Sequence, residues 1–175
     1  MTLAEILKFV HVVAVIVWLG GAFMMGFLFE RAQRSQDEAT VLGLAKIGDF
    51  VGKAVFNPAG IITLLAGIWL VIELDGVEFS DAWISIGFLG VALGAGLGMA
   101  FYPKALARVR DGIVSDGLLS NETLAGLRRL RLVSTLEWVF LIVVVWAIVF
   151  KPGALLNVMA EADAPVEIAI VFGTE

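Results

Sequence analysis

Four long apolar blocks, joined by shorter charged segments, constrain the fold of this chain more than any other feature. They cover residues 7–29, 54–72, 83–102 and 133–150. A helix needs about 20 apolar residues to cross a bilayer, and each block is close to that length or longer. Because hydrocarbon offers no partner to backbone N–H and C=O groups, each block must be helical. We therefore predict an all-α, multi-pass membrane protein built as a four-transmembrane-helix bundle.

The composition supports one small membrane domain. Hydrophobic residues make up 60% of the 175 residues and charged residues 17%, whereas soluble domains are about 45–50% apolar and about 25% charged. We assign residues 1–153 to the membrane domain and residues 154–175 to an external C-terminal tail. The tail contains "PVEIAIVFG", which is too short to span a bilayer and is compatible with a short strand or a surface-lying segment.

Several classes of function are excluded or unsupported. The chain has no cysteine, which excludes disulfides, thiolate metal sites, iron–sulfur clusters and c-type haem attachment. Its net charge is −5 and it has no long basic tract, so nucleic-acid binding has no support. The first apolar run is longer than a signal-peptide core and lacks a charged leader apart from Lys8, so we interpret it as a retained membrane helix.

The basic residues predict the orientation. Ten of the twelve lie in two alternate connections, between the first and second blocks or between the third and fourth: Arg31, Arg34, Lys46, Lys53, Lys104, Arg108, Arg110, Arg128, Arg129 and Arg131. The connection between the second and third blocks has none. The positive-inside rule places the two basic connections in the cytoplasm and both termini outside. We predict a multi-pass protein of the cell inner (plasma) membrane, in contact with the lipid bilayer.

Both basic connections are predicted to contain helix. In residues 37–53, apolar residues recur on one helical face, which predicts an amphipathic helix at the inner interface or running into the second block. The residues on this face are Val41, Leu44, Ile47 or Gly48, and Val51. Ser120 is predicted to be the N-cap of a long helix that enters the fourth block, and Pro152 is expected to end that helix.

Glycines predict close helix packing. Gly90, Gly94 and Gly98 are four residues apart in the third block, so they share one face on which another backbone can approach. This face fits packing inside the bundle, and it also fits a homodimer seam.

The first ionisable candidate inside lipid is His11, which shares a helical face with Lys8 and Trp18. An ionisable group in a membrane helix is a functional candidate because its burial is costly. A neutral imidazole can bind haem iron or copper, so His11 is the candidate metal ligand, with Lys8 and Trp18 beside it. An interfacial histidine hydrogen-bonded to a carbonyl or headgroup, and a proton or substrate role, remain alternatives.

The second candidate is Glu137, about one turn into the fourth block. Asn57 and Tyr102 are expected at a similar depth, so the three residues form a predicted inner-face polar cluster. Glu137 fits a structural ion pair with Lys104 or a nearby arginine. A proton or cation relay would need a further polar group deeper in the bundle. Because His11 and Glu137 lie toward opposite faces of the membrane, they cannot form one acid–base pair.

The segment "LKFVHVVAVIVWLGG", with a histidine followed seven residues later by Trp-x-Gly-Gly, resembles the first helix of copper-resistance-D-like membrane proteins. It is also similar to a related family called predicted integral membrane protein, a four-helix domain of unknown function. The segments "ITLLAGIWLV" and "VFKPG" extend the resemblance to residues 5–153.

The resemblance implies haem b or copper bound through His11, since relatives are associated with copper handling or with haem held by a first-helix histidine. The chain lacks the additional histidines and the methionine-rich segments of a copper handler. Three functions therefore stay open. They are haem or metal binding through His11, a non-catalytic accessory subunit of a larger membrane complex, and an ion or small-solute carrier.

Overall fold

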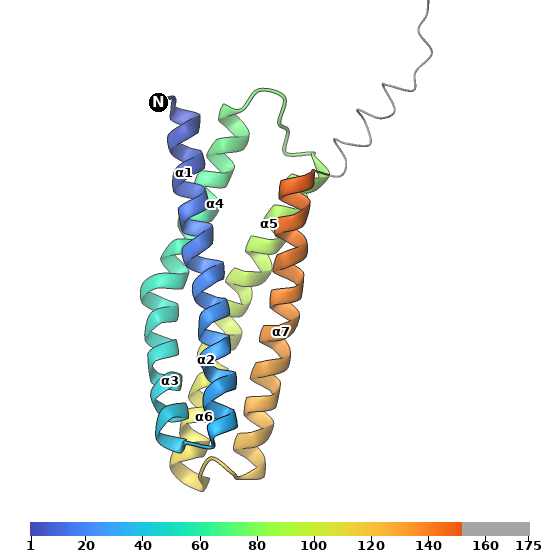
Figure 1. Cartoon of the computed structure of the whole chain (residues 1–175). Coiled ribbons are helices and arrows are strands. Elements are labelled where there is room, and N and C mark those ends of the chain that lie inside the picture. The colour runs from blue at the N-terminus through green and yellow to red at the C-terminus, as the bar shows by residue number, and fades with distance from the viewer. Residues whose placement is uncertain (152–175) are drawn as a thin grey trace, which may run out of the picture.

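The computed structural model of the protein describes residues 1–151, so the predicted tail lies outside the described residues. The described chain forms four long antiparallel helices and no strand (Figure 1). The first comprises α1 (Leu3–Val15), η1 (Ile16–Gly20) and α2 (Gly21–Ser35), and the second α3 (Glu38–Val51), η2 (Gly52–Phe56) and α4 (Asn57–Glu73). The third comprises α5 (Ala82–Gly96), η3 (Leu97–Phe101) and α6 (Tyr102–Asp116), and the fourth is α7 (Asn121–Phe150). The predicted all-α bundle of four helices is confirmed.

The helices are longer than a bilayer requires. They contain 33, 36, 35 and 30 residues and all are apolar enough to cross a membrane. At 1.5 Å per residue they measure about 45–54 Å, against a hydrocarbon core of about 30 Å. Each predicted apolar block lies within one helix, and the basic connections form the helical ends beyond the blocks. The segment predicted to be amphipathic is therefore α3, which runs directly into the second block.

The two halves of the bundle pack differently. In the half that contains the N-terminus, α1 packs along α4 and α5 packs along α7. Figure 1 shows these two pairs diverging toward that end, where a loop joins α4 to α5. In the other half α6 contacts both α3 and α7, so the helices converge.

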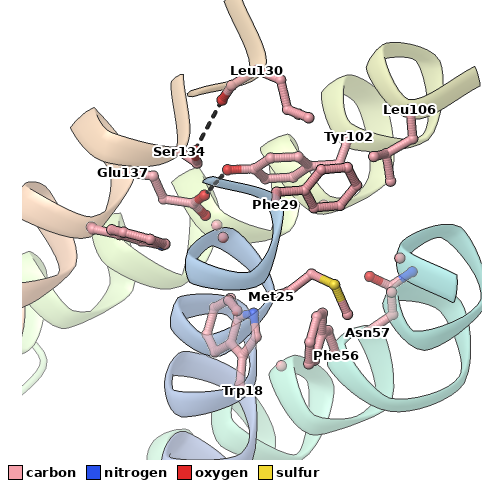
Figure 2. Close-up of a pocket in the computed structure, with 18 of the residues that line it drawn as sticks. Trp18, Met25, Phe29, Phe56, Asn57, Tyr102, Leu106, Leu130, Ser134 and Glu137 are labelled. Atoms are coloured by element: carbon pink, nitrogen blue, oxygen red, sulfur yellow. Dashed lines mark hydrogen bonds between the residues drawn. The ribbon is translucent and has the colours of Figure 1, made fainter. Parts of the chain in front are cut away.

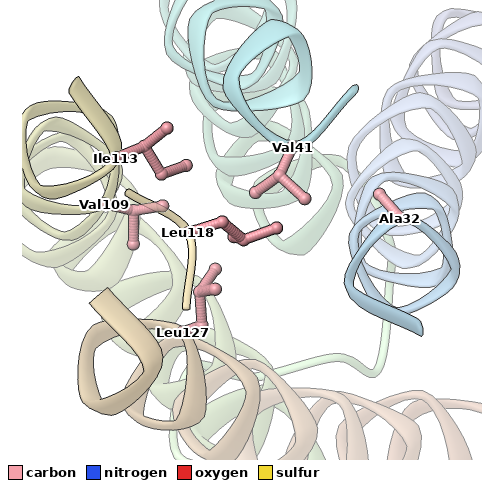
Figure 3. Packing of buried hydrophobic residues seen from close by; sticks show 6 residues of the cluster. All are labelled: Ala32, Val41, Val109, Ile113, Leu118 and Leu127. Carbon is pink, nitrogen blue, oxygen red and sulfur yellow. The ribbon is translucent and has the colours of Figure 1, made fainter. Parts of the chain in front are cut away.

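The converging half holds a core like that of a soluble bundle (Figure 3). Its most buried members come from α2, α3, α6, α7 and the turn before α7: Ala32, Val41, Val109, Ile113, Leu118 and Leu127. On α3, Val41 and Gly48 face this interior as predicted, while Ile47 is 53% exposed. Large apolar side chains remain exposed on the outer surface of the bundle, among them Phe9, Ile16 and Ile72 in the half that contains the N-terminus, as expected for residues that contact lipid.

Helix ends follow local capping chemistry. The Ser120 hydroxyl accepts from Thr123 N at 3.2 Å, which confirms the predicted N-cap of α7. The helix ends where Lys151 adopts a left-handed conformation, φ 45°, immediately before Pro152. At the turn between α2 and α3, Asp37 caps α3. The hydrogen bond donated by the Thr40 hydroxyl holds the pKa of Asp37 below its usual range.

Three of the four helices contain a π-helical segment near mid-length: η1, η2 and η3. Pro58 and Pro103 each lie two residues beyond the end of η2 and η3. A proline inside a helix lacks the N–H that would bond the carbonyl four residues earlier, and its ring clashes with that carbonyl. Widened turns relieve this conflict. η1 contains no proline. It ends at Gly20 and is followed by Gly21.

The glycine face of α5 packs within the chain. Gly90 lies against Val144 of α7, Gly94 against Trp18 of η1, and Gly98 of η3 near Asn57. The predicted packing inside the bundle is confirmed, but each glycine makes room for a side chain of another helix and not for the close approach of a backbone.

Candidate functional site

A cavity of about 660 Å³ lies between the helices at the level of the three π-segments. Its wall is mostly apolar, and Trp138 is one of the large side chains in it. Figure 2 shows three others, Trp18, Met25 and Phe56. Each π-segment supplies lining residues, namely Trp18 from η1, Gly52 and Phe56 from η2, and Gly98 and Met99 from η3. π-Bulges are common at functional sites because they reorient side chains. The three π-segments therefore lie around the same cavity.

The Trp18 indole is the central packing element of this region. It is 9% exposed and lies between the second and third helices. A Cβ atom placed on Gly60 would be 3.6 Å from the ring, and one placed on Gly94 would be 2.6 Å from it. Trp18 thus occupies a slot that two glycines leave open, which explains a tryptophan near the middle of the first long helix.

Glu137 is one of the few polar residues in the cavity wall. It is 7% exposed, and its carboxylate accepts a hydrogen bond from the Tyr102 hydroxyl (Figure 2). Asn57 lines the same cavity from α4. The structure therefore brings together the three residues of the predicted inner-face cluster. The sequence favoured an ion pair of Glu137 with Lys104 or a nearby arginine. Among the residues described Glu137 makes no ion pair, so that expectation was wrong.

A charged group that the sequence reasoning missed lies at the end of the cavity farther from the N-terminus, here called the inner end because the sequence predicts that side to be cytoplasmic. Glu30 of α2 pairs with Arg34 at 3.0 Å and with Arg131 of α7 at 3.5 Å. Glu30 and Arg131 both line the cavity. The spacing of four residues between Glu30 and Arg34 was the available signal, whereas the contact with Arg131 depends on how α2 and α7 pack.

His11 lies outside the cavity, in the groove between α1 and α4. Its Nδ1 is 2.9 Å from the Thr63 carbonyl oxygen, so the proton sits on Nδ1 and Nε2 keeps its lone pair. Gly67 provides room for the ring, since a Cβ there would be 3.1 Å from His11 Cε1. The seven residues from His11 to Trp18 correspond to roughly 10 Å along the helix. Of the three residues predicted to bind a cofactor, only Trp18 lines the cavity; Lys8 is exposed on α1.

The donor set around His11 is small. Within residues 1–151, no group of three or more His, Asp or Glu side chains is arranged to hold a metal ion. The structure thus places the oriented imidazole of His11 at one depth in the bundle and the cavity with the buried carboxyl group of Glu137 at another.

Four membrane-crossing helices that enclose a mostly apolar cavity define a multi-pass integral membrane protein. Residues 5–152 match the family described as a predicted integral membrane protein, DUF2269, and the chain belongs to that family. This confirms the resemblance to an uncharacterised membrane family; the likeness to copper-resistance-D-like proteins has no support from the match. No curated protein and no solved structure matches the chain.

Proposed function

We propose that this membrane protein reversibly binds an amphipathic small molecule in the cavity. The polar end of the ligand would meet Glu137 and Tyr102, and its apolar part would lie against Trp18, Phe56 and Trp138. The observation that carries the proposal is a buried carboxyl group without an ion-pair partner in the described structure, facing a mostly apolar cavity. Ionisable groups in that position in membrane proteins mark substrate or ion pathways.

The dimensions support a ligand of drug-like size. Small-molecule sites are commonly apolar clefts of about 300–1,000 Å³ with a few polar groups that orient the ligand. The 660 Å³ cavity falls in that range, and its polar groups gather around Glu137 and the inner end. Of the functions left open by the sequence, a small-solute carrier is therefore the one that this cavity supports best.

Binding can be tested with N-phenyl-1-naphthylamine, a neutral apolar fluorophore, using energy transfer from the tryptophans in neutral-lipid nanodiscs. Gly52 lines the cavity and has open space where a side chain would begin. We expect Gly52→Leu to fill part of the cavity and weaken binding by about tenfold, or about 1.4 kcal/mol.

The matched control is Gly43→Leu on α3, which also extends into open space but does not line the cavity. It should leave the affinity unchanged. Equal weakening by both substitutions, or no saturable binding to the wild-type protein, contradicts the proposal.

The anchoring of His11 favours a second function, the binding of haem b or copper. The Thr63 carbonyl orients the ring and leaves Nε2 available as a ligand, the arrangement in which a second-shell acceptor supports a ligating histidine. The residues around it supply this one ligand and do not complete a metal site, so no reaction is derived from it.

An optical spectrum of the purified protein tests this second function. If His11 is an axial ligand, the wild-type protein should show a Soret band, which His11→Ala should abolish and Lys8→Met should leave in place. A colourless, metal-free wild-type preparation after expression with added haem and copper would rule it out.

A further inference from the structure

We propose that the cavity exchanges a lipophilic cation for a proton carried by Glu137. This inference rests on the proposed function and names the class of its ligand. The observation behind it is the juxtaposition of a buried carboxyl group with aromatic rings in a cavity whose one cationic residue in the described lining, Arg131, is paired with Glu30.

The charged and titratable groups around the cavity are few. The described lining contains Tyr102 from α6, which donates to Glu137, and the Glu30–Arg131 pair at the inner end. The wall contributed by α3, η2 and α4 holds Asn57 and no charged residue, and that from α5 and η3 holds no charged residue. Arg131 precedes Glu137 by six residues, or roughly 9 Å along α7, and its guanidinium is engaged by Glu30.

Charge balance in an apolar medium then dictates the exchange. An ionised carboxylate removed from water without a cation costs several kcal/mol. Two neutral states avoid this cost: the carboxylic acid alone, and the carboxylate paired with a bound cation. Cation binding breaks the O–H bond of the acid and releases one proton to solvent, so the net charge of the site is the same before and after.

The aromatic residues favour a delocalised organic cation over a metal ion. Indole faces attract cations, most strongly where water is excluded, and Trp18 and Trp138 both line the cavity that Glu137 faces. A hydrated inorganic ion would have to exchange its water shell for a mostly apolar wall, which offers few oxygen ligands. A large organic cation loses little hydration and fills the volume.

The probe is tetraphenylphosphonium, titrated into the wild-type protein in neutral-lipid nanodiscs between pH 5 and pH 9. We expect the affinity to fall as the pH is lowered, approaching about tenfold per pH unit once the ligand-free carboxyl group is protonated. In weakly buffered solution near the acidic end, about one proton should be released per cation bound. Binding of the neutral N-phenyl-1-naphthylamine to the same protein should not vary with pH.

Glu137→Gln should remove the pH dependence of tetraphenylphosphonium binding and the proton release. Glu73→Gln, which changes an exposed carboxyl group at the end of α4, should preserve both.

If the neutral fluorophore binds and the cation does not, the exchange is disproved and the proposed function survives. The same holds if the cation binds with no proton release. If laurate, a carboxylate anion, displaces the fluorophore and the cation does not, the exchange is likewise disproved. Arg131 would then be the residue that binds the charged end of the ligand. If neither probe binds, the proposed function fails as well. The proton count on wild-type protein decides the question even where Glu137→Gln does not fold.

Discussion

Gly94→Leu is expected to destabilise the protein by about 1–3 kcal/mol, the usual cost of adding bulk to a well-packed interior. A Cβ at position 94 would lie 2.6 Å from Trp18 Cζ2 and 3.0 Å from Cη2, closer than atoms can pack. On its other side the ring faces Gly60 of α4, where an added Cβ would lie 3.6 Å from it, so a ring displaced by the new side chain is pushed toward α4. The third helix would have to separate from the first two, and the midpoint of thermal unfolding, followed by circular dichroism in one detergent, should fall.

The matched control is Gly96→Leu, two residues further along the same helix. Gly96 is exposed and a Cβ there meets nothing within 4 Å, so the added side chain enters the surrounding lipid or detergent. Its unfolding midpoint should stay close to that of the wild type. If the two leucine variants unfold alike, the packing of Trp18 against Gly94 does not stabilise the bundle.

A compensating pair makes the test specific to the ring. Gly94→Ala should be rescued in part by Trp18→Phe, because the smaller ring vacates the space that the new methyl group needs. The double variant should therefore lose less stability than the sum of the single losses, a coupling of about 0.5–3 kcal/mol. Simple additivity would show that the two positions do not contact each other.

Removing one partner of the Tyr102–Glu137 hydrogen bond and removing both partners are expected to affect stability differently. Removing the Tyr102 hydroxyl leaves the buried carboxyl group without its donor, which costs about 1–3 kcal/mol. Replacing both partners, in Tyr102→Phe/Glu137→Leu, leaves neither group of the pair unsatisfied, and substitutions of this kind are often neutral or stabilising. We therefore expect Tyr102→Phe to lower the unfolding midpoint and the double variant to restore or raise it.

The contrast is informative about why a carboxyl group is present. A residue retained for ligand binding can be replaced without loss of stability, whereas a residue retained for the fold cannot. Thermal unfolding of Tyr102→Phe, Glu137→Leu and the double variant in the same detergent is the measurement, and the cost of Tyr102→Phe should shrink in the Glu137→Leu background. A large loss of stability in the double variant would show that the pair primarily holds the bundle together.

Parts of the site were readable from the sequence and parts were not. Glu137, Asn57 and Tyr102 were grouped by depth alone, and the structure brings them to one cavity. The absence of an ion pair with Lys104 could not be foreseen, because the direction of a side chain around a helix depends on the rotation of that helix in the bundle. The pairing of Glu30 with Arg131 was missed for the same reason: the two residues are far apart in the chain and meet only where α2 and α7 pack.

Hydrophobicity, charge and local capping alone determined that this chain crosses a membrane four times as helices, that α7 begins after Ser120, and that it ends before Pro152. These features depend on the length of apolar runs and on contacts within a few residues, which the order of amino acids states directly. Only the tertiary structure decided that Trp18 fills a slot between Gly60 and Gly94, that three π-segments line one cavity, and that His11 lies outside it. Those features depend on how the helices are rotated and spaced against one another, and in lipid that is settled by the summed close packing of many side chains rather than by any local signal.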